Sequence, residues 1–289
     1  MIDKPHEDTD YKMKKCLNCS GKLLDLSTKA VMGILNLTPD SFHDGDKNLH
    51  GDHYIEHTGK MINDGATIID VGGQSTRPGS ELLDEESEWS RIKKPLAILV
   101  QEFPQMIFSI DTFYSSVAKR AIDTGASIIN DVSGGNIDAK MFSVVAKMKV
   151  PYILMHMKGT PQNMQVNPEY KDIVLDVLDF FSKKLYELKL LGLTDIILDP
   201  GFGFGKTLDQ NYTLLKHLNV FKICEAPILA GLSRKSMITK VLRVGNENSL
   251  NGTSVLNTIA LINGADMLRV HDVKEAKEAI DLVNKMKTV

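Results

Sequence analysis

The stretch Asp64-Gly65-Ala66-Thr67-Ile68-Ile69-Asp70-Val71 contains the pattern that decides the fold. A Gly-Ala pair precedes a short apolar run, and an ionisable side chain stands near the end of that run. The same Gly-Ala pair precedes apolar runs within residues 124–129 and 263–268. Glycine at the end of a helix adopts a left-handed backbone conformation at little cost. We therefore expect a helix to end before each pair and a strand to begin after it.

Eight such apolar runs occur along the chain, each closed by a polar or ionisable residue. They span residues 31–36, 67–71, 107–111, 127–131, 152–156, 195–199, 227–233 and 266–271. Segments with helical periodicity lie between them, such as residues 173–188, where apolar side chains recur three or four positions apart. This alternation predicts a parallel sheet of mixed α/β class. Eight units favour closure into a single (β/α)8 TIM barrel over the alternative, an open doubly wound sheet.

The bulk composition fits one such barrel and excludes some classes of partner. The chain has 289 residues, of which 43% are hydrophobic and 25% charged. We expect a short N-terminal extension at residues 1–29 and the barrel domain at residues 30–289. A net charge of -3 provides no overall basic field for binding nucleic acid or an anionic membrane. The N-terminus lacks the apolar core of a signal peptide, so we expect a cytoplasmic protein.

The three cysteines do not form a disulfide framework. Cys16 and Cys19 form a lone C-x-x-C pair, and a closed zinc site would need four ligands. We therefore interpret both as surface thiols on the N-terminal extension.

The glycine-rich segment after the sixth run resembles nucleotide-binding loops but fails both templates. A P-loop requires glycine where Pro200 stands, and a dinucleotide fingerprint requires glycine or alanine where Lys206 stands. What remains is a strand ending at Asp199 and a turn whose glycines let the backbone approach a ligand. Phe202 or Phe204 would supply an aromatic wall.

The polar residues at the run ends are the candidate site. They are Asn36, Asp70, Asp111, Asn130, Asp131, His156, Asp199, Ser233, Arg269 and His271. In a closed barrel they would meet at the C-terminal rim, where such barrels carry their active sites. Asp111, Asn130 and Asp199 are candidates for metal binding, for acid and base catalysis, or for accepting paired hydrogen bonds from a flat heterocycle. Each of the three is also a candidate for capping the next helix.

Basic residues near the last two runs indicate an anion site. Ser233-Arg234-Lys235-Ser236 is expected to open a helix, and a helix N-terminus attracts anions. Arg269 and His271 alternate onto one face of the last strand. A charged side chain facing into a barrel needs a partner. We interpret that partner as an anion such as a phosphate, with an internal salt bridge as the alternative.

Seven motifs together resemble the dihydropteroate synthase family. They are MGILNLTPDSF at 32–42, DVGGQSTRPG at 70–79, Asn130-Asp131, Met155-His156-Met157, the glycine loop from Asp199, Ser233-Arg234-Lys235-Ser236 and Arg269-Val270-His271. The resemblance runs from about residue 30 to the C-terminus. It implies a transferase of an alkyl group other than methyl. This enzyme would condense 6-hydroxymethyl-7,8-dihydropterin pyrophosphate with 4-aminobenzoate, giving 7,8-dihydropteroate and pyrophosphate in folate biosynthesis.

The resemblance also implies roles for individual residues. The pterin-binding residues are Asp111, Asn130, Asp199 and Lys235. The pyrophosphate-binding residues are Asn36, Arg77, Arg269 and His271, and Asn36 also holds Mg2+. The aminobenzoate-binding residues are Phe42, Pro78, Phe204, Lys235 and Ser236. The catalytic set is Asp40, Thr76, Arg77, Asp111, Lys235, Arg269 and His271, with Asp40 and Thr76 in two loops that close over the reacting centre.

The family resemblance further implies a homodimer, and inhibition by sulfonamides because nothing is inserted between Gln74 and Pro78. Two positions depart from the family pattern: Asp46 stands where a glycine is frequent, and Gln74 where glutamate is frequent. Two alternatives remain. A pterin-dependent methyltransferase barrel would bind a folate without pyrophosphate, and a non-catalytic pterin-binding relative would bind without turnover.

Overall fold

The computed structural model describes residues 16–37, 53–74, 82–160, 162, 164 and 168–288. Its larger sheet has eight strands, all paired in parallel, in the order β8-β7-β6-β5-β4-β3-β10-β9. They are β3 (Ala30–Asn36), β4 (Ile68–Gly72), β5 (Ile107–Asp111), β6 (Ile128–Asp131), β7 (Tyr152–Met155), β8 (Ile196–Asp199), β9 (Leu229–Ala230) and β10 (Met267–Val270). A bridge between Leu198 and Ile228 joins the two ends of the sheet. The predicted barrel is therefore confirmed over the open sheet.

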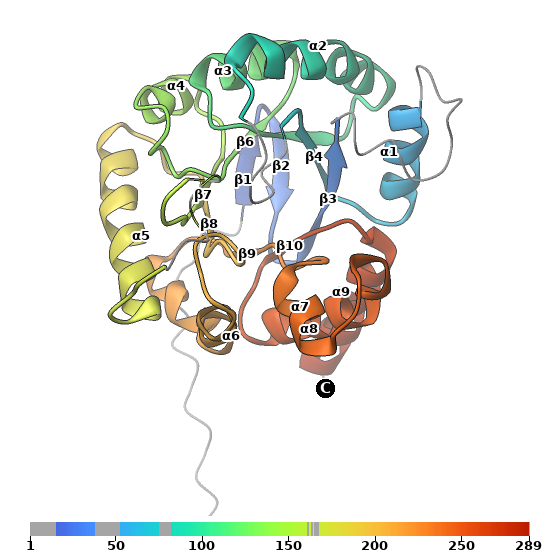
Figure 1. Cartoon of the computed structure of the whole chain (residues 1–289). Helices are drawn as coiled ribbons and strands as arrows, with labels where there is room; N and C mark the ends of the chain where they lie inside the picture. Colours follow the sequence, from blue (N-terminus) through green and yellow to red (C-terminus); the bar gives the residue numbers. More distant parts are fainter. Residues whose placement is uncertain are drawn as a thin grey trace, which may run out of the picture.

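The helices form a ring around these strands (Figure 1). They are α1 (His53–Asn63), α2 (Glu85–Glu102), α3 (Ser115–Thr124), α4 (Met141–Met148), α5 (Ile173–Leu190), α6 (Leu208–Lys216), α7 (Ser236–Leu242), α8 (Leu250–Ile262) and α9 (Val273–Lys287). Two short 3-10 helices, Leu218–Cys224 and Asn246–Asn248, complete the connections. Within the described part of the chain, no helix combines the length and apolar character needed to cross a bilayer.

The Gly-Ala pairs lie where the sequence predicted them, between a helix and the next strand. Gly65, Gly125 and Gly264 have φ angles of +104°, +118° and +106°. The backbone N–H of Gly125 donates to carbonyls in the last turn of α3, which satisfies groups that a helix end leaves unpaired.

The seventh strand is much shorter than its apolar run. The sequence predicted residues 227–233, whereas β9 covers only Leu229–Ala230. After Ala230 the backbone enters a turn in which Arg234 has a φ of +55° and Ser233 bonds to His271. The prediction was too long because the apolar residues continue past Ala230 into this turn, where the backbone is no longer extended.

An antiparallel hairpin that the sequence analysis missed closes the N-terminal end of the barrel. It consists of β1 (Cys16–Cys19) and β2 (Lys22–Asp25), seen within the ring of helices in Figure 1. Its Leu17, Cys19 and Leu24 join a buried apolar cluster with one or more residues from each barrel strand. The strand residues are Ala30, Met32, Ile68, Ile107, Ile128, Ile153, Ile197, Leu229 and Met267.

The hairpin corrects one interpretation of the C-x-x-C pair. Cys16 is exposed, but Cys19 is fully buried in that apolar cluster. Burial raises the pKa of the Cys19 thiol to about 12. The interpretation as two surface thiols is therefore wrong for Cys19, because alternate residues of a strand face opposite sides. The domain boundary at residues 29 and 30 stays a prediction.

Candidate functional site

The period of a β-strand places polar side chains directly above the apolar layer inside the barrel. Residues two apart on a strand face the same side. Each polar residue therefore follows, two positions later, a member of the buried apolar cluster. The polar residues placed in this way are Asp70, Ser109, Asn130, Asp199 and Arg269. They lie toward the C-terminal ends of their strands, at the mouth of the barrel.

Three of these mouth residues, Asp70, Asn130 and Arg269, form one hydrogen-bonded group with Asp111 at the end of β5, and we call these four residues the mouth network. Asp70 Oδ2 accepts from Arg269 Nε at 2.7 Å and from Asn130 Nδ2 at 2.9 Å. Arg269 Nη2 donates to Asp111 Oδ2 at 2.7 Å. Arg269 thus has the internal salt bridges that the sequence analysis held as the alternative, and its contact with an anion stays a prediction.

Burial shifts the proton equilibria of the mouth. It raises the pKa of the Asp111 carboxyl to about 7, although Arg269 opposes the shift. It also raises the pKa of Asp199, against the opposing effect of Lys235. Burial lowers the pKa of the Lys235 ammonium to about 8. Groups that titrate close to neutral pH are typical of functional sites.

Asp199 and Lys235 both lie beside Gly231. A Cβ added to Gly231 would lie 3.8 Å from Lys235 Nζ and 3.9 Å from Asp199 Oδ2. Lys235 Nζ also donates to the Phe202 carbonyl and lies 4.8 Å from the centroid of the Phe204 ring. Phe202 itself is fully buried in the core. Phe204, the second of the two candidates, is therefore the ring next to the cation.

Lys206 holds the glycine loop, a role that the sequence analysis missed. Its side chain is 3% exposed, and Nζ donates to the carbonyls of Gly201, Phe204 and His156 at 2.8, 2.9 and 3.2 Å. Gly201 has a φ of +69°, and a Cβ there would lie 2.0 Å from the His156 carbonyl oxygen. The glycine permits a close approach to the end of β7 rather than to a nucleotide.

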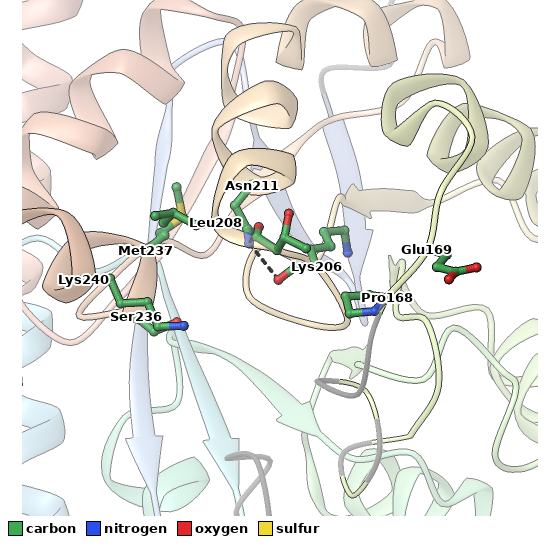
Figure 2. A pocket seen from close by; sticks show the side chains of 9 residues that line it. Pro168, Glu169, Lys206, Leu208, Asn211, Ser236, Met237 and Lys240 are labelled. Carbon is green, nitrogen blue, oxygen red and sulfur yellow. Dashed lines mark hydrogen bonds between the residues drawn. The ribbon is translucent and has the colours of Figure 1, made fainter.

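Ser236 opens α7, as predicted, and borders a cavity of about 550 Å³. Figure 2 shows Ser236, Met237 and Lys240 of α7 on one side of this cavity and Pro168 and Glu169 on the other. Lys206, Thr207, Leu208 and Asn211 complete its lining. No residue of the mouth network lines the cavity.

The remaining basic residues of the predicted anion site have partners of their own. Ser233 Oγ lies 3.0 Å from His271 Nδ1. Arg234 forms a two-point ion pair with Asp272, at 3.0 and 2.6 Å. Arg234 therefore joins the turn after β9 to the start of α9.

Asp131 and His156 are run-end residues with structural contacts outside the mouth network. Asp131 accepts from the Tyr152 hydroxyl at 2.6 Å and from two backbone N–H groups, so it stabilises the turn after β6. His156 is buried, with its ring 5.0 Å from that of Phe180. Burial lowers the pKa of His156 to about 2, so its ring is neutral at physiological pH.

The predictions for the two long loops fall partly outside the described residues. Asp40, Phe42, Asp46, Thr76, Arg77 and Pro78 all lie there. Gln74 is described, and its Oε1 accepts from the backbone N–H of Leu83 at 2.9 Å. Gln74, one of the two residues that depart from the family pattern, therefore bonds the start of the second loop to its end.

Two side-chain oxygens of the kind that Mg2+ binds lie next to Gly72. A Cβ on Gly72 would lie 3.7 Å from Asn36 Oδ1 and 3.9 Å from Asp111 Oδ2. Among the described residues, no cluster of three or more His, Cys, Asp or Glu side chains is arranged to hold a metal. Mg2+ commonly takes one or two protein oxygens together with substrate phosphates. The amide and carboxylate oxygens here fit that kind of site.

Comparisons with known proteins match this architecture. The family model for pterin binding enzymes matches residues 32–271. The chain is 42% identical to the dihydropteroate synthase of Escherichia coli over 92% of its own length and 95% of that protein. A Yersinia pestis dihydropteroate synthase solved as a sulfonamide drug complex superposes with a TM-score of 0.89 at 40% identity, covering 95% of this chain and 100% of that one. A Xanthomonas albilineans synthase with 4-aminobenzoic acid gives 0.88 at 35% identity, with 95% and 99% covered.

Proposed function

The chain belongs to the pterin binding enzymes as a member of the dihydropteroate synthase family, and we propose that Asp111 and Asn130 of its mouth network bind the pterin of the reaction. Dihydropteroate synthases transfer the pterin methylene group to 4-aminobenzoate in folate biosynthesis. A methyltransferase barrel and a non-catalytic relative are both less consistent with relatives that are synthases over nearly their full length. The observation that carries the proposal is the convergence of Asp111, Asn130 and Arg269 around Asp70.

The pterin is bound by Asp111, Asn130, Asp199 and Lys235. A pterin presents a flat edge of ring nitrogen and amino group that donates paired hydrogen bonds, and a carboxylate accepts such a pair. Burial of Asp111 and Asp199 strengthens these bonds, because water does not compete for the acceptors. Lys235 supplies the cation beside Asp199.

The leaving pyrophosphate is contacted by Asn36, Arg77, Arg269 and His271. The amine of 4-aminobenzoate is neutral at pH 7, so it needs no strong general base. The barrier lies in breaking the bond between the pterin methylene and pyrophosphate. Cationic donors aimed at the departing oxygens stabilise the charge that develops there. The bond to the aminobenzoate nitrogen then forms, and the amine proton is lost to solvent.

The side-chain oxygens around Asn36 are of the type that Mg2+ binds. Asn36 Oδ1 would hold it, with Asp111 Oδ2 nearby and pyrophosphate oxygens completing the coordination. When bound, the ion neutralises charge on the leaving group.

The aminobenzoate is placed by Phe42, Pro78, Phe204, Lys235 and Ser236. Phe204 offers a ring face beside Lys235, and the N-terminus of α7 at Ser236 suits a carboxylate. Asp40 and Thr76, which lie outside the described residues, have by the family resemblance the role of excluding water from the centre. Sulfonamides, which resemble 4-aminobenzoate, compete for this position. Full turnover at saturating sulfonamide would contradict this.

The test of the proposed function mixes purified protein with the pterin pyrophosphate substrate and Mg2+, with and without 4-aminobenzoate. Dihydropteroate is followed by mass and pyrophosphate by release assay. We expect product only when aminobenzoate is present. Pterin binding without product would favour the methyltransferase or the non-catalytic relative.

We also propose a homodimer, supported by an apolar face on α7 and α8. Val255, Ile259 and Ile262 recur at helical spacing on α8 and are 50%, 37% and 52% exposed, and Val241 and Leu242 of α7 are similarly exposed. Sedimentation should give a dimer that Ile259→Glu dissociates. Leu190→Glu, on the exposed face of α5, is the control that should leave the dimer intact.

A cytoplasmic location is part of the same proposal. Cys16, Cys19 and Cys224 are all free thiols, as a reducing compartment favours. Cell fractionation of a tagged full-length chain tests it, and recovery with secreted proteins would contradict it.

A further inference from the structure

We propose that Asp70 is a positioning residue that fixes both the amide of Asn130 and the guanidinium of Arg269. This inference rests on the proposed function, which assigns those two side chains to the pterin and the pyrophosphate. Asp70 is fully buried and sits at the centre of the mouth network. The roles set out above give it no contact with either substrate.

The first step is the orientation of the Asn130 amide. An ionised carboxylate only accepts hydrogen bonds, so the group that faces Asp70 Oδ2 must be the NH2 of Asn130. The carbonyl Oδ1 of Asn130 is then directed away from Asp70. A pterin edge donates N–H groups, so an amide presented through its oxygen is complementary. Without Asp70, the Asn130 amide has no fixed preference between its two orientations.

The second step is the plane of Arg269. Its Nε donates to Asp70 and its Nη2 to Asp111, which holds the planar guanidinium at two points. Nη1 takes part in neither bond. Asp70 and Asp111 together therefore determine how Arg269 is presented to a leaving group. One carboxylate oxygen, Asp70 Oδ2, thus bonds both to Asn130, assigned to the pterin, and to Arg269, assigned to the leaving group.

Two substitutions at Asp70 separate these contributions. Asp70 Oδ1 has no hydrogen-bond partner among the residues that the structure describes. Asp70→Asn can therefore keep an oxygen at the Oδ2 position as the acceptor for Asn130 and Arg269. It removes the negative charge and places one NH2 donor at the buried Oδ1 position. Asp70→Ala removes the acceptor as well. We expect Asp70→Asn to keep the Kd for the pterin pyrophosphate substrate within about threefold while kcat falls about tenfold, since Arg269 loses one charged partner.

For Asp70→Ala we expect the same Kd to rise about tenfold, which is the size of effect that loss of one oriented hydrogen bond gives. Calorimetry with 6-hydroxymethyl-7,8-dihydropterin pyrophosphate and Mg2+, without aminobenzoate, measures it. The decisive measurement is the Kd of the double variant that combines Asp70→Ala with Asn130→Ala. If Asp70 acts through Asn130, Asp70→Ala in that background should change Kd by less than about threefold.

Asp266→Asn is the matched control. Asp266 is also buried and also bonds two partners, Lys29 Nζ at 2.6 Å and the Ile228 N–H at 3.0 Å, but it precedes β10 at the opposite end of the barrel. It should lower the melting temperature and leave Kd unchanged. A wild-type Kd in Asp70→Ala, full additivity with Asn130→Ala, or an equal Kd change in Asp266→Asn would each overturn the proposal. If the wild-type protein formed no dihydropteroate, the proposed function would be refuted. The Kd values of the variants would still show whether Asp70 positions Asn130 for pterin binding.

Discussion

At the scale of single residues, Arg269 is the side chain whose removal best separates catalysis from binding. We expect Arg269→Ala to lower kcat by about 10² to 10³, as loss of a preorganised donor to a developing charge does. The Kd for the pterin pyrophosphate should rise much less, because the substitution leaves in place Asn130 and Asp199, which we propose as pterin contacts. Single-turnover kinetics and calorimetry measure the two effects.

Arg234→Ala is the control for Arg269, since Arg234 is paired with Asp272 and makes none of the bonds of the mouth network. It should leave kcat within about twofold, as expected for a side chain outside the reacting centre. Equal losses of kcat and of pterin affinity in Arg269→Ala would contradict a role on the leaving group.

The pKa values of the mouth predict how pterin binding depends on pH. Asp111, with its pKa raised to about 7, accepts paired hydrogen bonds only when ionised, so affinity should increase as pH rises through that value. Lys235, with its pKa lowered to about 8, loses its charge above that pH, so affinity should fall again. Calorimetry from pH 6 to 9 should give a narrow maximum. Asp111→Asn should remove the acid limb alone, and an acid limb that persists would contradict the assignment.

The sequence predicts which polar residues stand at the ends of the barrel strands, but it does not predict which of them bond to one another. Asp111, Asn130 and Asp199 were predicted because strand ends meet at one rim of a barrel. The partner of Arg269 was not, since Asp70 lies 199 positions away and a sequence gives no measure of that distance. The pattern placed Asp70 at the mouth but could not show that it bonds both Asn130 and Arg269.

At the scale of elements, the glycine loop between β8 and α6 depends on Lys206. Lys206→Met removes the donor for three carbonyls and should destabilise the protein by about 3 kcal/mol. Because the loop carries Phe204, KM for 4-aminobenzoate should rise about tenfold, with a smaller change for the pterin substrate. Lys240→Met places the same substitution on the exposed face of α7 in the wall of the same cavity. Equal effects of the two substitutions would show that Lys206 does not position the loop.

Elements with strong periodicity were predictable, and short ones were not. α5 was predicted over residues 173–188 and covers Ile173–Leu190, because its apolar stripe is long enough to identify a helix. The β1–β2 hairpin has only four residues in each strand. Its one local signal is Ser20-Gly21, where φ angles of +54° and +88° make the tight turn. Such a dipeptide is too common to predict a hairpin by itself.

At the scale of the whole molecule, the barrel divides stability and chemistry between its two ends. The hairpin is joined to the N-terminal end, where Asn18 N–H donates to Asp195 at 3.0 Å and Lys22 Nζ to the Met106 carbonyl at 2.7 Å. The mouth network is at the C-terminal end of the same strands. An apolar layer formed by residues of the barrel strands separates the two. Substitutions in the hairpin should therefore change the free energy of unfolding without changing turnover.

Two adjacent leucines in β2 test this separation. Leu24 is 4% exposed and packs in the apolar cluster that closes the barrel, whereas Leu23 is 72% exposed. We expect Leu24→Ala to lower the free energy of unfolding by about 2–4 kcal/mol, and Leu23→Ala to change it by less than about 0.5 kcal/mol. Denaturant titration measures both. The kcat of folded Leu24→Ala should match that of the wild type, because no bond of the mouth network reaches the hairpin. A lowered kcat with an unchanged free energy of unfolding would instead mean that the hairpin influences the mouth through the barrel.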